Sequence, residues 1–193
     1  MLAGIDEAGR GPLAGPVCAA SVILGPDFPV EILNDSKKLS AKKREAAMVL
    51  IYRKAPAWGI GWASAAEIDE INILKASLLA MRRAFFDMTG RMGNFPGGAL
   101  EALVDGIYVP ELPIPARAVI KADAKYPEVM AASILAKTAR DRMMERYAWL
   151  YPEYGYDLHK GYPTKEHRAR IIKYGPSPIQ RMSFTVRRID NNG

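Results

Sequence analysis

The sequence predicts an α/β fold in which helices flank one mixed β-sheet. Two observations lead to this expectation. Short apolar segments with strand character alternate along the chain with segments of helical character. The 193 residues are also 49% hydrophobic, which is enough for a substantial core. The sequence contains no repeat and no flexible linker, so we expect one domain with at most a small appended subdomain.

Five segments have the apolar character of strands: residues 2–6, 16–24, 57–64, 99–105 and 116–122. Between the second and the third, residues 41–54 predict a helix, with Ser40 as its N-cap. Before the fourth, residues 89–98 are rich in glycine and predict a loop. Five strands interleaved with helices are typical of a central sheet covered on its faces.

Two longer helices are expected. Ser64 and Glu67 have the spacing of a capping box, which begins a helix running to about Met88 with a break near Ile71–Asn72.

The other long helix should cover residues 127–150, since Pro127 suits the first turn of a helix. Its apolar side chains predict a buried face, and we expect Lys137, Arg140 and Arg142 to point away from that face. The chain then divides into a main domain, residues 1–150, and a C-terminal segment of short helices and loops, residues 151–193.

Several classes of protein are excluded by simple features. The single cysteine, Cys18, cannot form an intramolecular disulfide, and its apolar neighbours predict a small buried side chain. The two histidines, His159 and His167, lack a cysteine partner or an HExxH motif, so a zinc site is not expected. Neither a signal peptide nor a transmembrane segment is recognisable, which makes the cytoplasm the expected location.

Positive charge is concentrated late in the chain. The formal net charge is +6, and residues 137–188 contain 12 Lys or Arg against 5 Asp or Glu, an excess larger than that of the whole chain. A basic surface suits a polyanion such as nucleic acid. From charge alone, an ordinary solvated surface is an equally good interpretation.

The N-terminal loop Gly9–Ala14 formally matches the dinucleotide fingerprint GxGxxA. That motif requires a helix directly after it, whose N-terminus holds the pyrophosphate. Here Pro12 and Pro16 interrupt the chain and a strand is expected next. A dinucleotide site is therefore rejected.

Four acidic residues lie at the C-terminal ends of expected strands: Asp6 ends the first and Glu7 follows it, Asp105 ends the fourth, and Asp123 comes directly after the fifth. Ligands bind at the carboxyl ends of strands in open α/β sheets, so these carboxylates should meet at one edge. Mg²⁺ and Mn²⁺ prefer oxygen ligands, and two such ions can drive phosphodiester hydrolysis. For any one of these acids alone, capping of a turn or a helix is the better interpretation, and that interpretation weakens when the four are taken together.

Six motifs, in this order, resemble those of one known family, ribonuclease HII, the type 2 ribonuclease H. The resemblance covers nearly the whole chain. The motifs are GIDEAGRGPLAGPV (4–17), NDSKKLS (34–40), EIDEINIL (67–74), LVDG (103–106), KADAKYPEVMAASILAKTARDRMM (121–144) and KGYPTKEH (160–167) followed by YGPSPIQRMSF (174–184).

The resemblance implies a ribonuclease H-like fold: a five-stranded mixed sheet flanked by helices, plus a small C-terminal helical subdomain. Its first three strands would be antiparallel and the others parallel to the first. The implied activity is endonucleolytic cleavage of RNA in RNA/DNA hybrids, and cleavage 5′ of single ribonucleotides in duplex DNA, leaving 3′-hydroxyl and 5′-phosphate ends. Such an enzyme would remove ribonucleotides in DNA repair and replication.

The resemblance also implies roles for individual residues. Mg²⁺ or Mn²⁺ would be bound by the four acids Asp6, Glu7, Asp105 and Asp123. The junction between ribonucleotide and deoxyribonucleotide would be read by Gly9, Arg10, Gly11 and Tyr162. Glycines let the backbone approach a 2′-hydroxyl, the group that distinguishes RNA from DNA. Without the resemblance, Tyr162 would be interpreted as an aromatic residue packed under a loop.

Other basic and polar residues are weaker candidates. Lys37 and Ser133 could hold substrate phosphates, and Ser133 lies four positions before Lys137 on the expected helix, so the two should share one face. Packing of Ser133 against the sheet is an equal alternative. Duplex-gripping contacts are expected from Arg168, Arg170 and Arg181.

One residue departs from the family pattern, and the C-terminus bears on which partners the protein has. Ala122 stands where the family commonly has glycine, and its methyl group could shift Asp123. The C-terminal RRIDNNG contains no docking peptide for a sliding clamp, and a monomer is expected. Two alternatives remain at this stage: another nuclease of the same broad fold, such as a junction resolvase, and a non-catalytic nucleic-acid-binding module.

Overall fold

The structure, a computed structural model, describes residues 1–33, 40–93 and 99–184. Its centre is a five-stranded mixed sheet in the order β3-β2-β1-β4-β5. Strands β1, β2 and β3 pair antiparallel, and β4 and β5 run parallel to β1, as the resemblance implied. The bounds of the strands are β1 Leu2–Ala8, β2 Val17–Ile23, β3 Ala57–Ala63, β4 Glu101–Asp105 and β5 Ala116–Val119.

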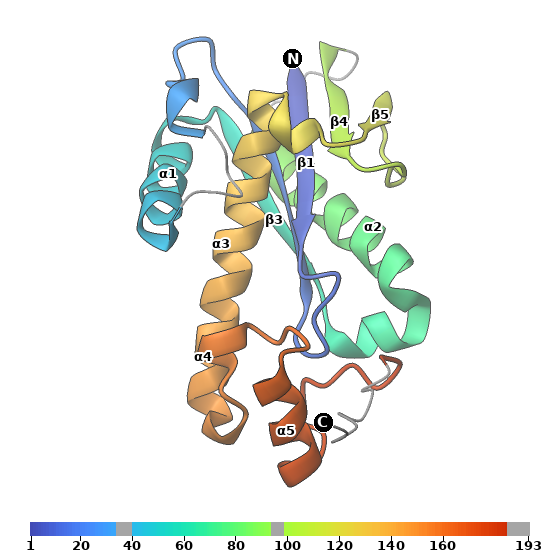
Figure 1. The fold of residues 1–193 in the computed structure, drawn as a ribbon. Coiled ribbons are helices and arrows are strands. Elements are labelled where there is room, and N and C mark those ends of the chain that lie inside the picture. Colours follow the sequence, from blue (N-terminus) through green and yellow to red (C-terminus); the bar gives the residue numbers. More distant parts are fainter. Residues whose placement is uncertain (34–39, 94–98, 185–193) are drawn as a thin grey trace.

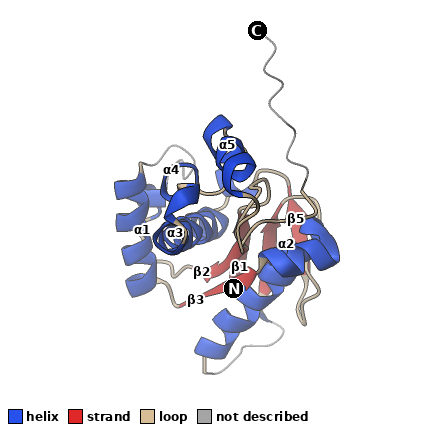
Figure 2. Cartoon of the chain, turned by 90° about the horizontal axis from the view of Figure 1, so that it is seen from below, coloured by secondary structure: helices blue, strands red, loops and turns tan. Residues whose placement is uncertain are grey.

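Helices cover both faces of this sheet. One face carries α2 (Ala65–Arg91), and the other carries α1 (Ala41–Lys54) and α3 (Pro127–Leu150) (Figure 1). Seen from below, the sheet lies between α2 and the pair α1 and α3 (Figure 2). The fold class predicted from the sequence is therefore confirmed.

Strand β2 shows why the core has two halves. All seven of its residues are buried, because side chains alternate between two covered faces. Val17 and Ala19 pack in the cluster under α2, whereas Cys18 and Ala20 pack in the cluster under α1 and α3. Cys18 is thus the small buried side chain that its sequence context predicted.

The predicted helix signals are confirmed. Ser40 accepts a hydrogen bond from the backbone N–H of Lys43, and both bonds of the Ser64–Glu67 capping box are present. The predicted break in α2 lies at Asn72, whose φ of 69° is left-handed. The Asn72 side-chain oxygen accepts hydrogen bonds from the backbone N–H groups of Leu74 and Lys75, so Asn72 acts as an N-cap for the second half of the helix.

The chain around Asp123, the last of the four predicted acids, differs from expectation. Strand β5 ends at Val119 rather than at residue 122, and a short 3₁₀ helix, η3 (Ala122–Ala124), follows. Lys121 turns the chain between them with a left-handed φ of 57°. Asp123 therefore lies on a 3₁₀ turn, not at a strand end. Similarly, β1 continues to Ala8, so Asp6 and Glu7 lie inside the strand rather than at its C-terminal end.

Helix α3 packs closely on β1. A Cβ atom on Gly4 would lie 2.2 Å from the backbone carbonyl carbon of Glu128, so only glycine allows this approach. The close crossing brings the following turns of α3 alongside the acidic end of β1. Residues far apart in sequence thereby come to share one site.

The C-terminal part folds onto the end of α3. A 3₁₀ turn η4 (Pro152–Tyr154) leads to α4 (Tyr156–His159) and α5 (Lys165–Tyr174) (Figure 1). A further 3₁₀ turn, η1 (Val30–Leu33), precedes α1. The chain after α5 then runs back along the N-terminal loop, where the backbone N–H of Gly15 donates to the carbonyl of Ile179 over 2.8 Å. None of the helices among the described residues has the length and apolar character needed to cross a membrane.

Candidate active site

Three carboxylates meet at the end of the central strands. Asp6, Asp105 and Asp123 each offer an oxygen, and these oxygens lie within 4.8 Å of one another. The parallel pairing of β1 with β4 ends at Ile5 and Val104, so Asp6 and Asp105 come next on adjacent strands. The pairing of β1 with β4 thus brings together two acids that are far apart in sequence.

Asp105 also orients the third acid. Its Oδ1 accepts a hydrogen bond from the backbone N–H of Ala122 over 2.7 Å, which anchors the 3₁₀ turn carrying Asp123. The methyl group of Ala122 is buried in a small apolar cluster with Leu103 and Val129. The structure therefore accommodates alanine at this position while Asp123 remains within the cluster.

Glu7 lies beside the three acids rather than among them. Its Oε1 is 3.4 Å from Nη1 of Arg10, while its buried Oε2 has no hydrogen-bond partner among the described residues. A buried carboxylate oxygen without a donor is unfavourable unless a ligand reaches it. Glu7 is thus available to a group bound between the four acids.

The electrostatics of this cluster favour a bound counter-charge. Burial raises the pKa of Asp6 well above its usual value, repulsion from Glu7 and Asp105 raises it further, and a hydrogen bond from Ser133 opposes both. Burial likewise raises the pKa of Glu7, against the attraction of Arg10. Carboxylates gathered in this way can take up protons or bind a cation. Oxygen-only ligands fit hard divalent ions such as Mg²⁺ or Mn²⁺.

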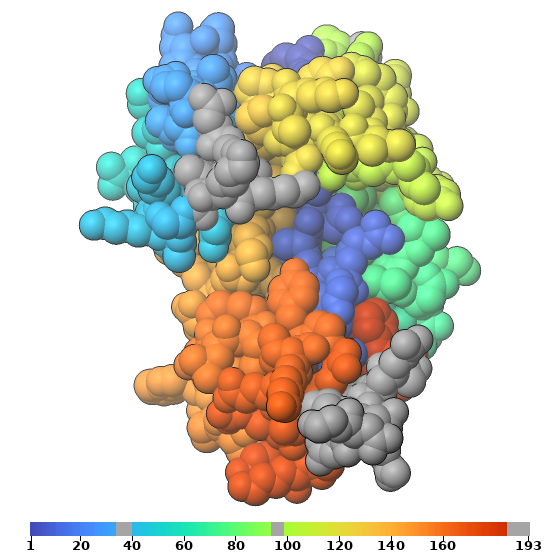
Figure 3. Space-filling view, viewed as in Figure 1, coloured from blue at the N-terminus to red at the C-terminus, as the bar shows by residue number. Residues whose placement is uncertain are grey.

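The acids form one wall of an open hollow of about 410 Å³. In the space-filling view, the atoms of the N-terminal loop lie at the base of this hollow, below the start of α3 and above the C-terminal helices (Figure 3). The remaining lining comes from several different segments: Ala8, Gly9, Arg10, Gly11, Arg44, Ser133, Lys137 and Tyr162. Every predicted site residue within the described part of the chain therefore borders the same space. Lys37 lies outside the described residues.

Tyr162 stands at the open side of this hollow. Its side chain is 39% exposed, and its ring lies 5.7 Å from the Lys137 ammonium. Among the described residues, the nearest neighbour of a Cβ atom on Gly11 would be a ring atom of Tyr162 at 3.9 Å, so space remains between the two. Tyr162 is thus not packed under a loop, the alternative that its sequence context allowed.

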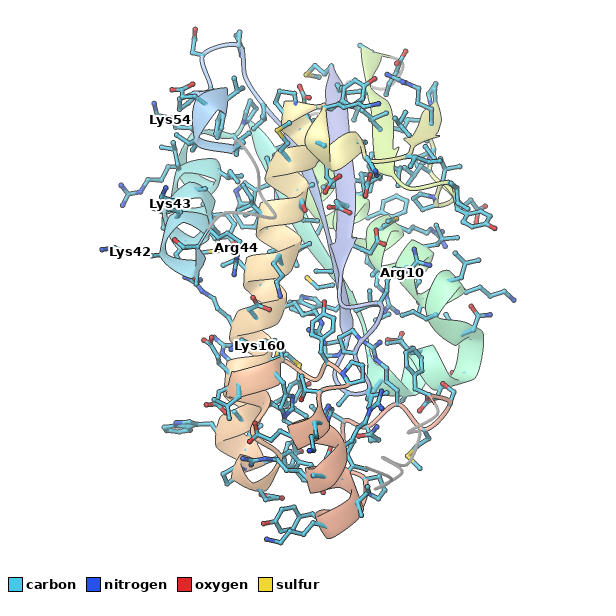
Figure 4. All side chains as sticks on the ribbon, viewed as in Figure 1. Arg10, Lys42, Lys43, Arg44, Lys54 and Lys160 are labelled. Atoms are coloured by element: carbon cyan, nitrogen blue, oxygen red, sulfur yellow. The ribbon has the colours of Figure 1, made fainter. Side chains whose placement is uncertain are left out.

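Two cations in the hollow, Arg44 and Lys137, were not singled out as site residues from the sequence. Arg44 extends from α1 toward α3, whereas Lys42 and Lys43 point away from α3 (Figure 4). Asp141 pairs with Lys137 at 2.7 Å and with Arg44 at 3.7 Å, which holds both cations at the rim. Ser133 and Lys137 share one helix face, as their spacing predicted. No local signal marks Arg44, because α1 and α3 meet only in the folded chain.

Two arginines differ from their predicted placement. Arg181 was expected on a duplex-gripping surface and Arg140 on the outer face of its helix, but both are fully buried. Their guanidinium groups donate to backbone carbonyls of the N-terminal loop, which accounts for the burial. Of the other two predicted gripping residues, Arg168 is half-buried, and Arg170 binds Glu166 and a backbone carbonyl.

The two histidines pack against each other beside the Tyr162 turn. Their rings stack at 4.3 Å, and the only cluster of potential ligands among the described residues is the acidic one. His167 Nδ1 hydrogen-bonds with the carbonyl oxygen of Tyr162, so the pair supports the Tyr162 turn.

The chain is similar to known proteins over nearly its whole length. The family model for ribonuclease HII matches residues 3–187. A curated ribonuclease HII from Treponema denticola is 54% identical over 202 residues, covering 98% of this chain and all of the relative. Among solved structures, the ribonuclease HII of Archaeoglobus fulgidus, determined as a complex with PCNA, is 29% identical with a TM-score of 0.73, covering 94% of this chain and 92% of that chain.

The ribonuclease H2 of Pyrococcus horikoshii is 27% identical with a TM-score of 0.72, covering 96% of this chain and 94% of that chain. These matches extend over the sheet, the acids and the C-terminal helices together. Residues 185–193, where no clamp-docking peptide was predicted, lie outside the described residues. The full-length match to the family model and to curated relatives means that the chain belongs to the ribonuclease HII family of nucleases.

Proposed function

We propose that this ribonuclease cleaves the RNA strand of RNA/DNA hybrids and cuts 5′ of single ribonucleotides in duplex DNA, leaving 3′-hydroxyl and 5′-phosphate ends. Its cellular role would be the removal of ribonucleotides during DNA repair and replication. One observation supports this above all. The acidic cluster and the loop of Gly9, Arg10 and Gly11 line the same hollow, so a strand held by the loop has its phosphate beside the acids.

Divalent cations, Mg²⁺ or Mn²⁺, would be held by Asp6, Glu7, Asp105 and Asp123, with two ions during the reaction. When bound, they would activate the attacking water and stabilise the leaving 3′ oxygen. The residues fit such ions because all four offer carboxylate oxygens and one of these, Oε2 of Glu7, is buried without a donor among the described residues.

The loop is suited to reading a sugar. Gly11 is not forced to be glycine by a left-handed φ, and within the described part of the chain a Cβ atom there would meet only the Tyr162 ring, so its lack of a side chain leaves room for a ligand. Backbone groups of the loop could then reach a 2′-hydroxyl, which DNA lacks. The exposed face of Tyr162 would stack on the neighbouring sugar.

The cations at the rim would hold the strand. Arg44 and Lys137 are positioned by Asp141, and Ser133 lies one helical turn before Lys137 on the same face. Phosphate contacts of this kind position a nucleic acid without reading its sequence. Residues 1–150 would thus supply the acids, and residues 151–193 would contribute Tyr162 to substrate contact. We further propose that the protein works as a monomer in the cytoplasm.

The deciding experiment is a cleavage assay on duplex DNA that contains one ribonucleotide, with Mg²⁺, Mn²⁺ or a chelator. We expect one cut, 5′ of the ribonucleotide, that requires the metal. An all-DNA duplex and a four-way DNA junction serve as controls. Cleavage of the junction with no cut at the ribonucleotide would instead support a resolvase, and binding without any cleavage would support a non-catalytic module.

A further inference from the structure

Two arginines lie buried behind the loop of residues 9–16. Arg140 comes from α3 and Arg181 from the segment after α5, and both are fully inaccessible to solvent. Neither forms an ion pair with a carboxylate of the described residues. Buried charges normally require pairing, so these two must be stabilised in another way.

The partners of Arg181 are carbonyl oxygens of the loop. Its Nη2 donates to Gly9 over 2.6 Å, its Nη1 to Arg10 over 2.9 Å, and its Nε to Gly15 over 2.8 Å. Burial lowers the pKa of Arg181 to about 9, so the guanidinium remains charged at neutral pH. One planar group therefore fixes both ends of the loop.

Arg140 ties the same loop to the tyrosine turn. Its Nη2 donates to Ala14 over 3.2 Å, its Nε to Pro16 over 2.9 Å, and its Nη1 to Lys160 over 3.0 Å, two residues before Tyr162. The Arg140 guanidinium carbon also lies 5.8 Å from the centre of the Tyr162 ring. The loop and the tyrosine are thus joined through one side chain.

The loop backbone lies directly on this guanidinium. Gly9 has a left-handed φ of 97°, and a Cβ atom there would lie 2.0 Å from Nε of Arg140. Only glycine tolerates both the dihedral angle and the contact. The path of the loop is therefore determined by Arg140 on one side and Arg181 on the other.

The segment carrying Arg181 is itself anchored. The carboxylate of Asp69 on α2 accepts hydrogen bonds from the backbone N–H groups of Met182 and Ser183. The backbone N–H of Arg181 donates to the carbonyl of Leu13 over 2.9 Å. Arg181 is thus held against the sheet domain and does not face solvent.

We propose that Arg140 and Arg181 are positioning residues that set the loop of Gly9, Arg10 and Gly11 in register with Tyr162 and the acids, and so determine discrimination for a lone ribonucleotide. This inference rests on the proposed function. A displaced loop can still meet a 2′-hydroxyl in an all-ribonucleotide strand, where every sugar carries one. A lone ribonucleotide offers a single hydroxyl at a single place, so it is far less tolerant of displacement.

The test compares both substrates for Arg181→Lys and Arg181→Met. A misplacement of about 1 Å can lower the rate by about 10²-fold, so we expect kcat/KM on the lone-ribonucleotide duplex to fall by that order in Arg181→Met. On an all-RNA/DNA hybrid the fall should be much smaller. Arg181→Lys keeps the charge but loses the planar fork, so its loss of discrimination should be intermediate.

The matched control is Arg83→Met. Arg83 also donates to a backbone carbonyl, that of Trp62, but it lies on α2, and its other hydrogen bond among the described residues goes to Glu67 rather than to a carbonyl of the loop. Thermal unfolding of each variant separates folding from positioning. If Arg181→Met does not fold, Arg181→Lys decides the question.

A purely structural role would lower activity on both substrates by the same factor. An unchanged ratio between the two substrates in folded Arg181→Lys would therefore overturn the inference. The proposed function fails in a different way, because the wild-type protein itself would then not cut at the lone ribonucleotide.

Discussion

The substitution Asp6→Asn should abolish cleavage and, in the absence of metal, make the protein more stable. The introduced amide has nearly the same shape as the native carboxylate, and its oxygen could still accept the 2.7 Å hydrogen bond from the backbone N–H of Glu7. The substitution removes one negative charge from a buried cluster. The effect on stability therefore measures the repulsion among these carboxylates.

The size of that repulsion follows from the distances between the acids. Two ionised carboxylate oxygens 4.8 Å apart repel by about 3.5 kcal/mol at an effective dielectric constant of about 20. Because 4.8 Å is the largest separation within the cluster, the two neighbours Asp105 and Asp123 together repel an ionised Asp6 by about 7 kcal/mol or more, and Glu7 adds to this repulsion. Proton uptake by Asp6, whose pKa is raised, relieves part of this repulsion between carboxylates. We expect a net gain of about 1–2 kcal/mol, a typical value for a stabilising substitution at a functional site.

The gain should depend on pH in a definite direction. The folded state raises the pKa of Asp6 above its ordinary value of 3.8. The Asp6 carboxyl of the folded wild type is therefore neutral at a pH below 3.8, and it becomes charged as the pH rises through the folded-state pKa. The two proteins should therefore be equally stable near pH 4, and the variant should be the more stable one at about pH 8.

Thermal unfolding in a chelator is the assay. For a chain of 193 residues, a gain of about 1–2 kcal/mol corresponds to a Tm rise of about 2–8 °C. Added Mg²⁺ or Mn²⁺ should raise the Tm of the wild type more than that of the variant. Asp141→Asn is the control, since Asp141 is attracted to Lys137 and Arg44 and its loss should lower the Tm. A lower Tm for Asp6→Asn in chelator, or metal-dependent cleavage by it, would contradict this account of the acidic cluster.

Three further predictions concern the rest of the site. Tyr162→Ala should lower kcat/KM at a lone ribonucleotide by about 10–100-fold, the value of one stacking contact, with little change in Tm because Tyr162 is 39% exposed; wild-type cutting would remove it from the site. Burial lowers the pKa of His167 from 6.5 to about 4, so the wild type should lose stability as the pH falls through this range. Thermal unfolding measured at each pH should show a smaller loss of stability for His167→Asn. Substrate binding by the wild type should weaken as the salt concentration rises. In Arg44→Met, the slope of log K against log salt should be shallower by about 0.9 for each phosphate contact that is lost. Equal slopes for the wild type and the variant would exclude a phosphate contact of Arg44.

Much of the architecture follows from signals that are local in sequence. The Ser64–Glu67 capping box begins α2, and Asn72 interrupts it, because capping depends on residues three positions apart. The apolar runs that predicted five strands are buried by their covering helices, as in β2. The four acids could be recognised for the same reason, since each occurs within a short motif beside a strand.

Other parts of the site depend on contacts between segments that are distant in sequence. Asp123 lies on a 3₁₀ turn because Asp105 binds the backbone of Ala122, which no strand propensity predicts. Arg181 resembles any other basic residue of its segment, yet it donates to Gly9, 172 positions earlier. The fold class, the acids and the glycine loop were recognisable in the amino-acid sequence because they depend on neighbours along the chain. Which arginines are buried behind that loop became clear only from the folded chain, because burial depends on which distant carbonyl groups can replace water.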